Sequence, residues 1–266
     1  MLRAVIWVTF LEGIRSRAVY GITLLAGLMM AFTVILCSMI MRDVGKVATD
    51  FTLTTATFAT LLVVLFVGIT ILARDLERKT VYVALSRGVR RSNYIVGRFL
   101  GLALLLALIV AMLLFASLVT LLLVKQMYST FFGTVSLGLV AVAHLFVFVQ
   151  MVLITALSIL YSLVTSSSFI TFMLTAITWL IGSSTQEVKR LVESTDPSQI
   201  APITKWLVTI AYYLFPNLAL FDLKSAAAHG LTVSFPHLGF ALLYGLGYAV
   251  AVLSLAVILF KRKELT

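Results

Sequence analysis

Charged side chains gather in one short stretch of this otherwise apolar chain. Nine of its 30 charged residues fall between Arg74 and Arg98, and seven of the nine are basic. Apolar residues at helical spacing, among them Leu76, Val83 and Leu85, alternate with the charges. This combination predicts a short helix at a membrane surface, where basic side chains contact lipid head groups.

Motifs for catalysis and metal binding are absent. There is no phosphate-binding G-x-x-x-x-G-K-[ST] loop, so we do not expect this chain to hydrolyse ATP. C-x-x-C and H-E-x-x-H are also absent, and His144, His229 and His237 are far apart in sequence. The nine methionines fit soft-metal transport or simple packing in apolar spans. We expect no catalytic residue, cofactor or metal site in this chain.

His144 is the histidine whose position predicts a role. It lies about 13 residues into an uncharged run, roughly 20 Å along a helix, and Gln150 follows less than two turns later. Polar groups at this depth in a membrane face a bundle interior or a transport pathway. They also form hydrogen bonds between helices. Both interpretations stay open.

The composition places the protein in a membrane. Hydrophobic residues make up 62% of the chain and charged residues 11%, against about 25% charged in soluble domains. Uncharged runs of about 20 residues, enough to cross a ~30 Å hydrocarbon core, recur along it. We predict an all-α polytopic membrane protein, a single domain over 1–266. Its six predicted spans are 18–41, 51–73, 94–124, 131–164, 168–186 and 237–260.

Two smaller patterns refine this prediction. Gly97 and Gly101 have the G-x-x-x-G spacing that lets a membrane helix approach a neighbour closely. The only cysteine, Cys37, rules out a disulfide within the chain.

The charges outside the spans define two sides. With the N-terminus in the cytoplasm, that side holds thirteen basic and four acidic residues, and the other side holds seven and six. Basic residues in short loops favour the cytoplasm, so both termini are expected there. The net charge of +10 is then a topology signal, and no nucleic-acid partner is expected.

Prolines mark the region before the last span. All four lie between 197 and 236, and proline interrupts helices. We predict that 187–236 is an external region whose short helices enter the outer leaflet and return. An amphipathic surface loop is the alternative. In the first interpretation Tyr213, Pro216 and Asn217 join His144 and Gln150 as gate or pathway residues, and Asn217 satisfies a backbone acceptor released by Pro216.

The segment "RDLERKTVYVALSRGVRRSNYIVGRFLG" resembles the stretch after the second span of ABC-2-type permeases. The matching residues are Glu77, Thr80, Leu85, Ser86, Arg91, Gly97, Phe99 and Gly101, whereas Lys79 and Gly88 depart from the pattern. Segments 10–22, 212–230 and 257–265 resemble the elbow, the Pro-Asn segment and the basic tail of the same family. The nearest subgroup is the one with the permease of nitrous-oxide-reductase maturation, among the type V ABC exporters.

This resemblance implies a mechanism. Residues 1–17 form an interfacial elbow helix, and 74–93 form a cytoplasmic coupling helix that sits in a cleft of an ATPase. The permease dimerises, binds two ATPase subunits that hold ATP and Mg, contacts membrane lipids and lies in the cytoplasmic (inner) membrane. The expected coupling residues are Arg74, Asp75, Glu77, Arg78, Lys79, Thr80, Val83, Leu85, Ser86, Arg87, Arg90 and Arg91.

Two other functions remain open. A secondary transporter would need coupling-ion sites, but no acidic residue lies in the middle of a predicted span. A membrane anchor of an assembly complex would need no pathway. The sequence does not identify the substrate, which could be a lipid, glycan, peptide, drug or maturation factor.

Overall fold

Helices make up the protein. The computed structural model describes residues 1–40, 42–71, 90–133, 135–165, 167–194 and 202–262 and contains no β-strand within them. Among these described residues, six helices are long and apolar enough to cross a membrane, and a bent pair near residue 216 would make a seventh if it counts as one span. The predicted class, an all-α polytopic membrane protein, is confirmed.

The six long helices coincide broadly with the apolar runs. They are α2 (Arg17–Ser38), α3 (Val44–Val63) with its continuation to Ile71, α6 (Arg91–Met127), α7 (Leu137–Val164), α8 (Ser168–Ser194) and α11 (Phe235–Arg262). The fourth run is helical only from Leu137. Gly133 has a φ of 72°, and the Ser136 hydroxyl accepts a hydrogen bond from Leu139 N at 3.4 Å, which fixes the helix start there.

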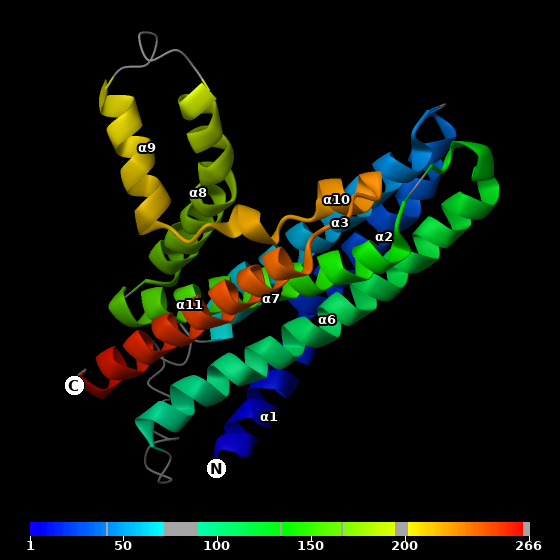
Figure 1. Cartoon of the computed structure of the whole chain (residues 1–266). Coiled ribbons are helices and arrows are strands. Elements are labelled where there is room, and N and C mark those ends of the chain that lie inside the picture. Colours follow the sequence, from blue (N-terminus) through cyan, green and yellow to red (C-terminus); the bar gives the residue numbers. More distant parts are fainter. Residues whose placement is uncertain (41, 72–89, 134, 166, 195–201, 263–266) are drawn as a thin grey trace.

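The bundle is centred on α6 and α7. Helix α6 packs against α2, α3, α7 and α11, while α7 also contacts α3, α8 and α11 (Figure 1). Leu102, Leu105 and Ile109 of α6 and Met151 and Leu153 of α7 are all buried. A continuous apolar core therefore joins the central helices.

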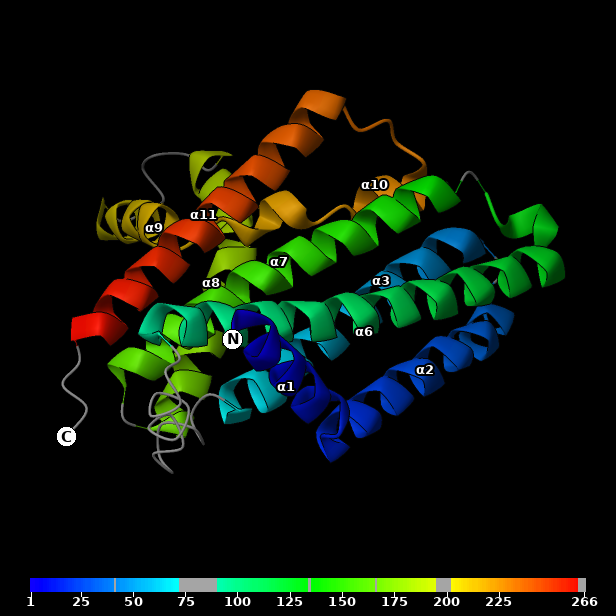
Figure 2. The same ribbon diagram turned by 90° about the horizontal axis from the view of Figure 1, so that it is seen from below.

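The first helix, α1 (Leu2–Ile14), packs along the beginning of α6 (Figure 2). A Cβ atom on Gly97 would lie 2.8 Å from Val5 Cβ, and one on Gly101 would lie 2.8 Å from the carbonyl oxygen of Ile6. The predicted close approach at these two glycines is confirmed, and the neighbour is α1. The place of α1 relative to the membrane surface stays a prediction.

Helix α3 changes its hydrogen-bonding pattern before its end. A π-helical segment, η1 (Val64–Gly68), follows directly after Val63. Five threonines of α3, beginning with Thr49, donate to backbone carbonyls three or four residues earlier. Such side-chain bonds satisfy the hydroxyls inside an apolar bundle. π-helical segments of this kind occur frequently at functional sites.

Both described chain ends lie beside the first two turns of α6. Val5 near the N-terminus contacts Gly97, and the Arg91 guanidinium donates to the carbonyl of Lys261 at 3.2 Å. The loop between α2 and α3 therefore belongs to the opposite end of the bundle (Figure 1).

Helices α8 and α9 (Pro202–Leu214) form a hairpin that stands away from the central bundle (Figure 1). After α9 the chain continues through η3 (Leu218–Phe221) and α10 (Lys224–His229), which packs on α3 and α7. The two halves of this pair meet at an angle of 59°. The bend falls at Phe215–Asn217, as expected for a helix interrupted by Pro216.

Candidate functional site

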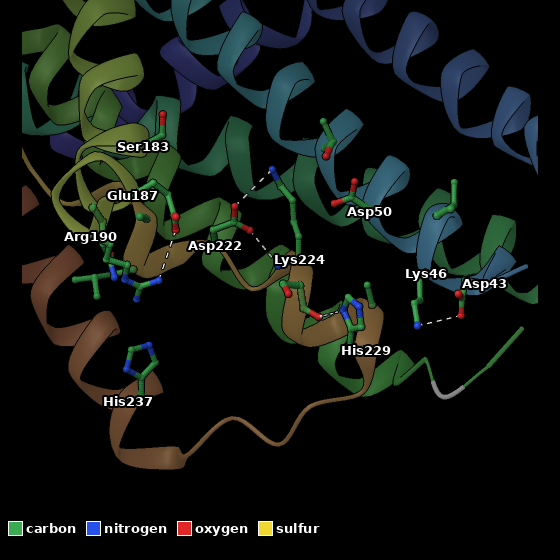
Figure 3. Close-up of a pocket in the computed structure, with 17 residues that line it drawn as sticks. Asp43, Lys46, Asp50, Ser183, Glu187, Arg190, Asp222, Lys224, His229 and His237 are labelled. Carbon is green, nitrogen blue, oxygen red and sulfur yellow. Dashed lines mark hydrogen bonds and ion pairs between the residues drawn. The ribbon is translucent and has the colours of Figure 1, made fainter. Parts of the chain in front are cut away.

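A large cavity opens at the end of the bundle opposite the two chain ends. Its volume is about 1100 Å³, and its walls come from the start of α3, the second half of α8, η3, α10 and the first turn of α11 (Figure 3). Lys46 and Asp50 lie on α3, and Glu187 and Arg190 lie on α8. The cavity thus brings together residues separated by more than a hundred positions in sequence.

Three parts of the cavity wall carry their own ion pairs. Lys46 Nζ lies 3.0 Å from Asp43 Oδ1, Arg190 Nη1 lies 3.6 Å from Glu187 Oε1, and Lys224 Nζ lies 3.8 Å from Asp222 Oδ2 (Figure 3). The two partners of every pair are two or three residues apart. Among the described residues, no ion pair therefore joins one wall to another.

The α3 wall shows how these local pairs are built. Asp43 precedes the helix with a φ of 55°, in the left-handed region that aspartate tolerates better than most residues. The hydrogen bond and the positive charge of Lys46 lower the pKa of the Asp43 carboxyl. Asp43 is therefore ionised at neutral pH, and the cavity keeps both signs of charge.

A second, smaller cavity continues inward from the first. It has a volume of about 60 Å³ and shares Ser183, Ala219, Asp222 and Lys224 with the large one. Gln150 of α7 and Trp179 of α8 also line it. The Trp179 indole Nε1 is buried and has no hydrogen-bond partner among the residues that the structure describes.

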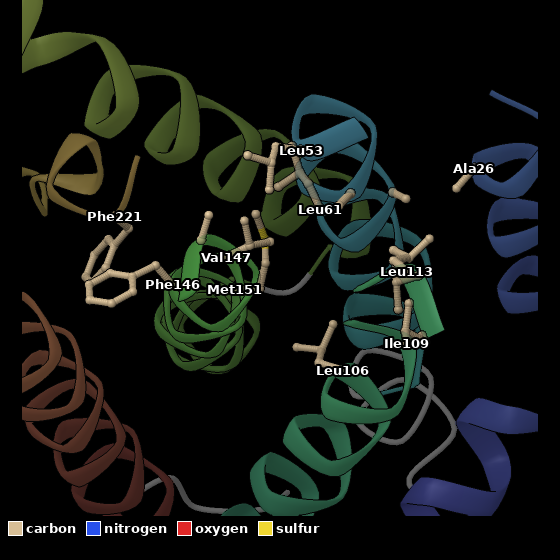
Figure 4. Close-up of a cluster of buried hydrophobic side chains, with 14 of the residues drawn as sticks. Ala26, Leu53, Leu61, Leu106, Ile109, Leu113, Phe146, Val147, Met151 and Phe221 are labelled. Atoms are coloured by element: carbon tan, nitrogen blue, oxygen red, sulfur yellow. The ribbon is translucent and has the colours of Figure 1, made fainter. Parts of the chain in front are cut away.

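The small cavity lies against the buried core. Leu53, Val147 and Phe221 line it and also belong to the core cluster (Figure 4). Its volume holds only about two water molecules at ~30 Å³ each. The charged site therefore narrows toward Gln150 and ends against packed apolar side chains.

His144 lies apart from both cavities. It is fully buried, and its Nδ1 donates to the Val140 carbonyl at 2.9 Å within the same helix. Because a carbonyl only accepts, Nδ1 carries the proton and Nε2 is an acceptor. Nε2 has no partner within the described part of the chain. Of these two polar residues of α7, Gln150 therefore lines a cavity and His144 does not.

The bend at Pro216 is held by contacts other than the predicted one. Asn217 donates its backbone N–H to the Tyr244 hydroxyl on α11 at 3.0 Å. The Asn217 side-chain oxygen is buried without a hydrogen-bond partner in the described ranges, and the role of Asn217 in satisfying a backbone acceptor released by Pro216 stays a prediction. The Pro216 carbonyl oxygen would lie 2.6 Å from a Cβ atom on Gly182. The bend is thus fixed between α8 and α11.

Tyr213 has a different environment. It is 78% exposed on α9, and its ring lies 5.4 Å from that of Tyr212. Lys189 Nζ lies 3.9 Å from the centre of the Tyr212 ring and joins α8 to α9. Tyr213 is therefore free for contact outside this chain, whereas Pro216 and Asn217 are packed inside it.

Most predicted coupling residues fall outside the described residues. These are the ten from Arg74 to Arg87, for which the structure gives no placement. Arg90 is exposed directly before α6, and Arg91 donates to the carbonyls of Phe260 and Lys261 at the end of α11. Arg91 thus joins two helices of this chain.

Several residues of the cavity were not predicted as site residues. The sequence analysis used the charges of Asp50, Asp222 and Lys224 only to assign the two sides of the membrane. An apolar run without a motif contains Trp179 and Ser183. Charged residues at the edges of apolar runs were the one available signal. No cluster of three or more His, Cys, Asp or Glu side chains suited to a metal ion occurs in the described part of the chain.

In the described part of the chain, six long apolar helices, a bent helix pair and a charged cavity at one end define a polytopic helical membrane protein. The family model of the ABC-2 family transporter proteins matches residues 3–265. The chain therefore belongs to the ABC-2 family, whose members are membrane-spanning subunits of ABC transporters and work with an ATPase subunit. A search among curated proteins gave no match.

Proposed function

We propose that this chain is the permease subunit of an ABC exporter and that it forms the export pathway for a separate cytoplasmic ATPase. Both chain ends and the 74–93 segment then face the cytoplasm, and the charged cavity opens to the outside. Two permease chains and two ATPase subunits form the complex, and the ATPases hold the ATP and Mg. The proposal rests on the charge asymmetry of the sequence and on the course of helix α3.

The course of α3 is the observation that carries the proposal. Lys46 and Asp50 on its first turns line the cavity, and its continuation reaches Ile71, three residues before the first expected coupling residue, Arg74. One helical element thus connects the cavity wall with the expected motor contact. The π-helical segment Val64–Gly68 lies between them and offers a place where the element can change its bend.

The beginning of α6 supports the same connection from the other side of the 74–93 segment. Arg91 binds the end of α11, and Arg98 lies 2.7 Å from Glu12 on α1. An ATPase that moves the start of α6 would therefore also move both terminal helices. The first turn of α11 in turn contributes His237 to the cavity.

The exposed apolar faces fit lipid and a second permease chain. On α2, Leu24, Leu28 and Phe32 are exposed, and an apolar groove of about 250 Å³ lies between α2 and α3. Lipid chains fit such surfaces. The exposed Tyr213 on α9 is the residue that we assign to the contact between two permease chains.

Affinity purification of the full chain from its native membrane tests the proposal. We expect an ATPase to be isolated with it in equal numbers, and its MgATP hydrolysis to depend on this chain. Glu77→Lys should weaken that association, since loss of one partner of a desolvated interfacial charge pair costs about 2–5 kcal/mol. Glu193→Lys, an exposed substitution on α8, is the control. Isolation of an assembly complex without an ATPase would favour the anchor function instead.

A further inference from the structure

The large cavity carries an unusual balance of charge. Two lysines, one arginine and two histidines line it, together with four carboxylates from Asp43, Asp50, Glu187 and Asp222. A polyanionic ligand would meet too many carboxylates, and a polycationic ligand would meet too many bases. This mixture fits a ligand that carries one charge of each sign.

Six of the seven Lys, Arg, Asp and Glu charges form local ion pairs along the cavity wall, and Asp50 is the seventh. Each of these three ion pairs lies within one wall, so none of them closes the cavity from side to side. Asp50 has no ion pair among the described residues and extends from α3 toward the space beside Lys224 and His229 (Figure 3). An ammonium group would bind Asp50, and an anionic group would bind Lys224 on α10, which packs against α3.

Helix α8 indicates that an apolar chain accompanies these charges. One of its faces lines the cavity with Ser183, Glu187 and Arg190. The neighbouring face presents Ile177, Leu180 and Leu191, which are all exposed. The rim of the charged cavity is thus apolar on the α8 side, which suits a molecule with a polar head and an apolar tail.

We propose that the cavity binds a zwitterion that carries an ammonium and a phosphate group, the chemistry of an amphiphile head group. The ammonium group lies against Asp50, the phosphate lies against Lys224, and any apolar tail follows the exposed face of α8. The inner cavity of about 60 Å³ is too small to take the head group further, so the ligand is held at the outer site. This inference rests on the proposed function, because it names the class of molecule that the permease handles.

Lipid binding to the purified full chain in detergent tests this inference without any ATPase. The probes are phosphatidylethanolamine, which has both charges, and phosphatidylglycerol, which lacks the ammonium group. Native mass spectrometry would give the dissociation constant for each. We expect Asp50→Asn and Lys224→Gln each to weaken phosphatidylethanolamine binding about 10-fold. Asp50→Asn should leave phosphatidylglycerol binding unchanged.

Matched controls and a soluble probe complete the experiment. Glu193→Gln and Lys125→Gln remove charges outside the cavity and should change neither dissociation constant. Water-soluble phosphoethanolamine separates the two sources of the chemistry. If phosphoethanolamine displaces the lipid, the head group alone is recognised. If the lipid binds and phosphoethanolamine does not displace it, the tail along α8 is required. Either result supports the proposed site if the binding is weakened in Asp50→Asn.

Two results would overturn the inference. One is an unchanged affinity for phosphatidylethanolamine in both cavity variants. The other is an equal loss of phosphatidylethanolamine and phosphatidylglycerol binding in Asp50→Asn. Because neither readout involves ATP, failure here is distinct from failure of the proposed coupling to an ATPase, which the copurification tests.

Discussion

The guanidinium of Arg98 lies 2.7 Å from the carboxylate of Glu12, and the two residues join α6 to α1. Arg98 is buried, and it also donates to the hydroxyls of Thr9 and Tyr94 at 3.1 and 3.3 Å. A buried charge requires such partners, because its desolvation is costly. The first helix is therefore fixed to the start of α6, next to the expected motor contact.

Loss of the Glu12 carboxylate should destabilise the protein. In Glu12→Ala, Arg98 keeps its burial but loses its counter-ion, which should cost roughly 2 kcal/mol. Thermal unfolding in detergent should show a lower Tm. Glu193→Ala is the control, because Glu193 is exposed and its pair with Lys189 spans 3.9 Å, worth about 0–1 kcal/mol. Equal Tm values for the two variants would contradict a structural role for the Arg98–Glu12 pair.

The glycines of α6 offer a second test of the same contact. A methyl group at position 101 would lie 2.5 Å from Thr9 Cβ and 2.8 Å from the Ile6 carbonyl oxygen, so Gly101→Ala should force α1 away. Overpacking of this kind costs about 1–3 kcal/mol. Gly247→Ala on α11 meets no atom within 4 Å and should not lower the Tm. A Tm for Gly101→Ala as high as that of the control would show that α1 does not pack there.

The bend at Pro216 should matter for transport. Tyr244→Phe removes the hydroxyl that accepts from Asn217 N, at a cost of about 1 kcal/mol. We expect transport to fall several-fold while the Tm changes by only a few degrees. Tyr248→Phe is the matched control on the same helix. Normal transport in Tyr244→Phe, with a lowered Tm, would show that the bend contributes to stability but not to transport.

Topology can be measured with single cysteines in a Cys37→Ala background. Lys46→Cys and Arg190→Cys lie at the cavity end and should react with an impermeant thiol reagent added to intact cells. Arg90→Cys is exposed at the other end of the bundle and should react only after the membrane is opened. The charge asymmetry is the reason for this orientation. The reverse pattern of labelling would invert the proposed topology.

The helices were predictable from the sequence because long uncharged runs in a membrane protein have few other conformations. The ends of the helices were less predictable. Residues 131–136 are as uncharged as the helix that follows, and only the backbone at Gly133 and the cap at Ser136 move the helix start to Leu137. The spacing of Gly97 and Gly101 predicted a close contact but carried no information about which helix would fill it.

The cavity could not be predicted, because its charges become neighbours only in the folded chain. Asp50 and Lys224 are 174 positions apart, and each stands at the edge of an apolar run, where a loop charge is ordinary. Gln150 was predicted as a pathway residue from its depth, and it does line the inner cavity. His144 gave the same signal from sequence, but the rotation of α7 places it outside both cavities.

The central claim is that the ATPase and the charged cavity are coupled through this chain. The most direct test is the rate at which Ser183→Cys, in a Cys37→Ala background, reacts with an impermeant thiol reagent in the purified complex with its ATPase. Ser183 lines both cavities, and cysteine is close to serine in size. We predict that MgATP trapped with vanadate changes this rate at least fivefold, while the rate for Lys125→Cys, outside both cavities, stays the same. Identical rates at position 183 with and without trapped nucleotide, in a complex that hydrolyses ATP, would contradict the coupling.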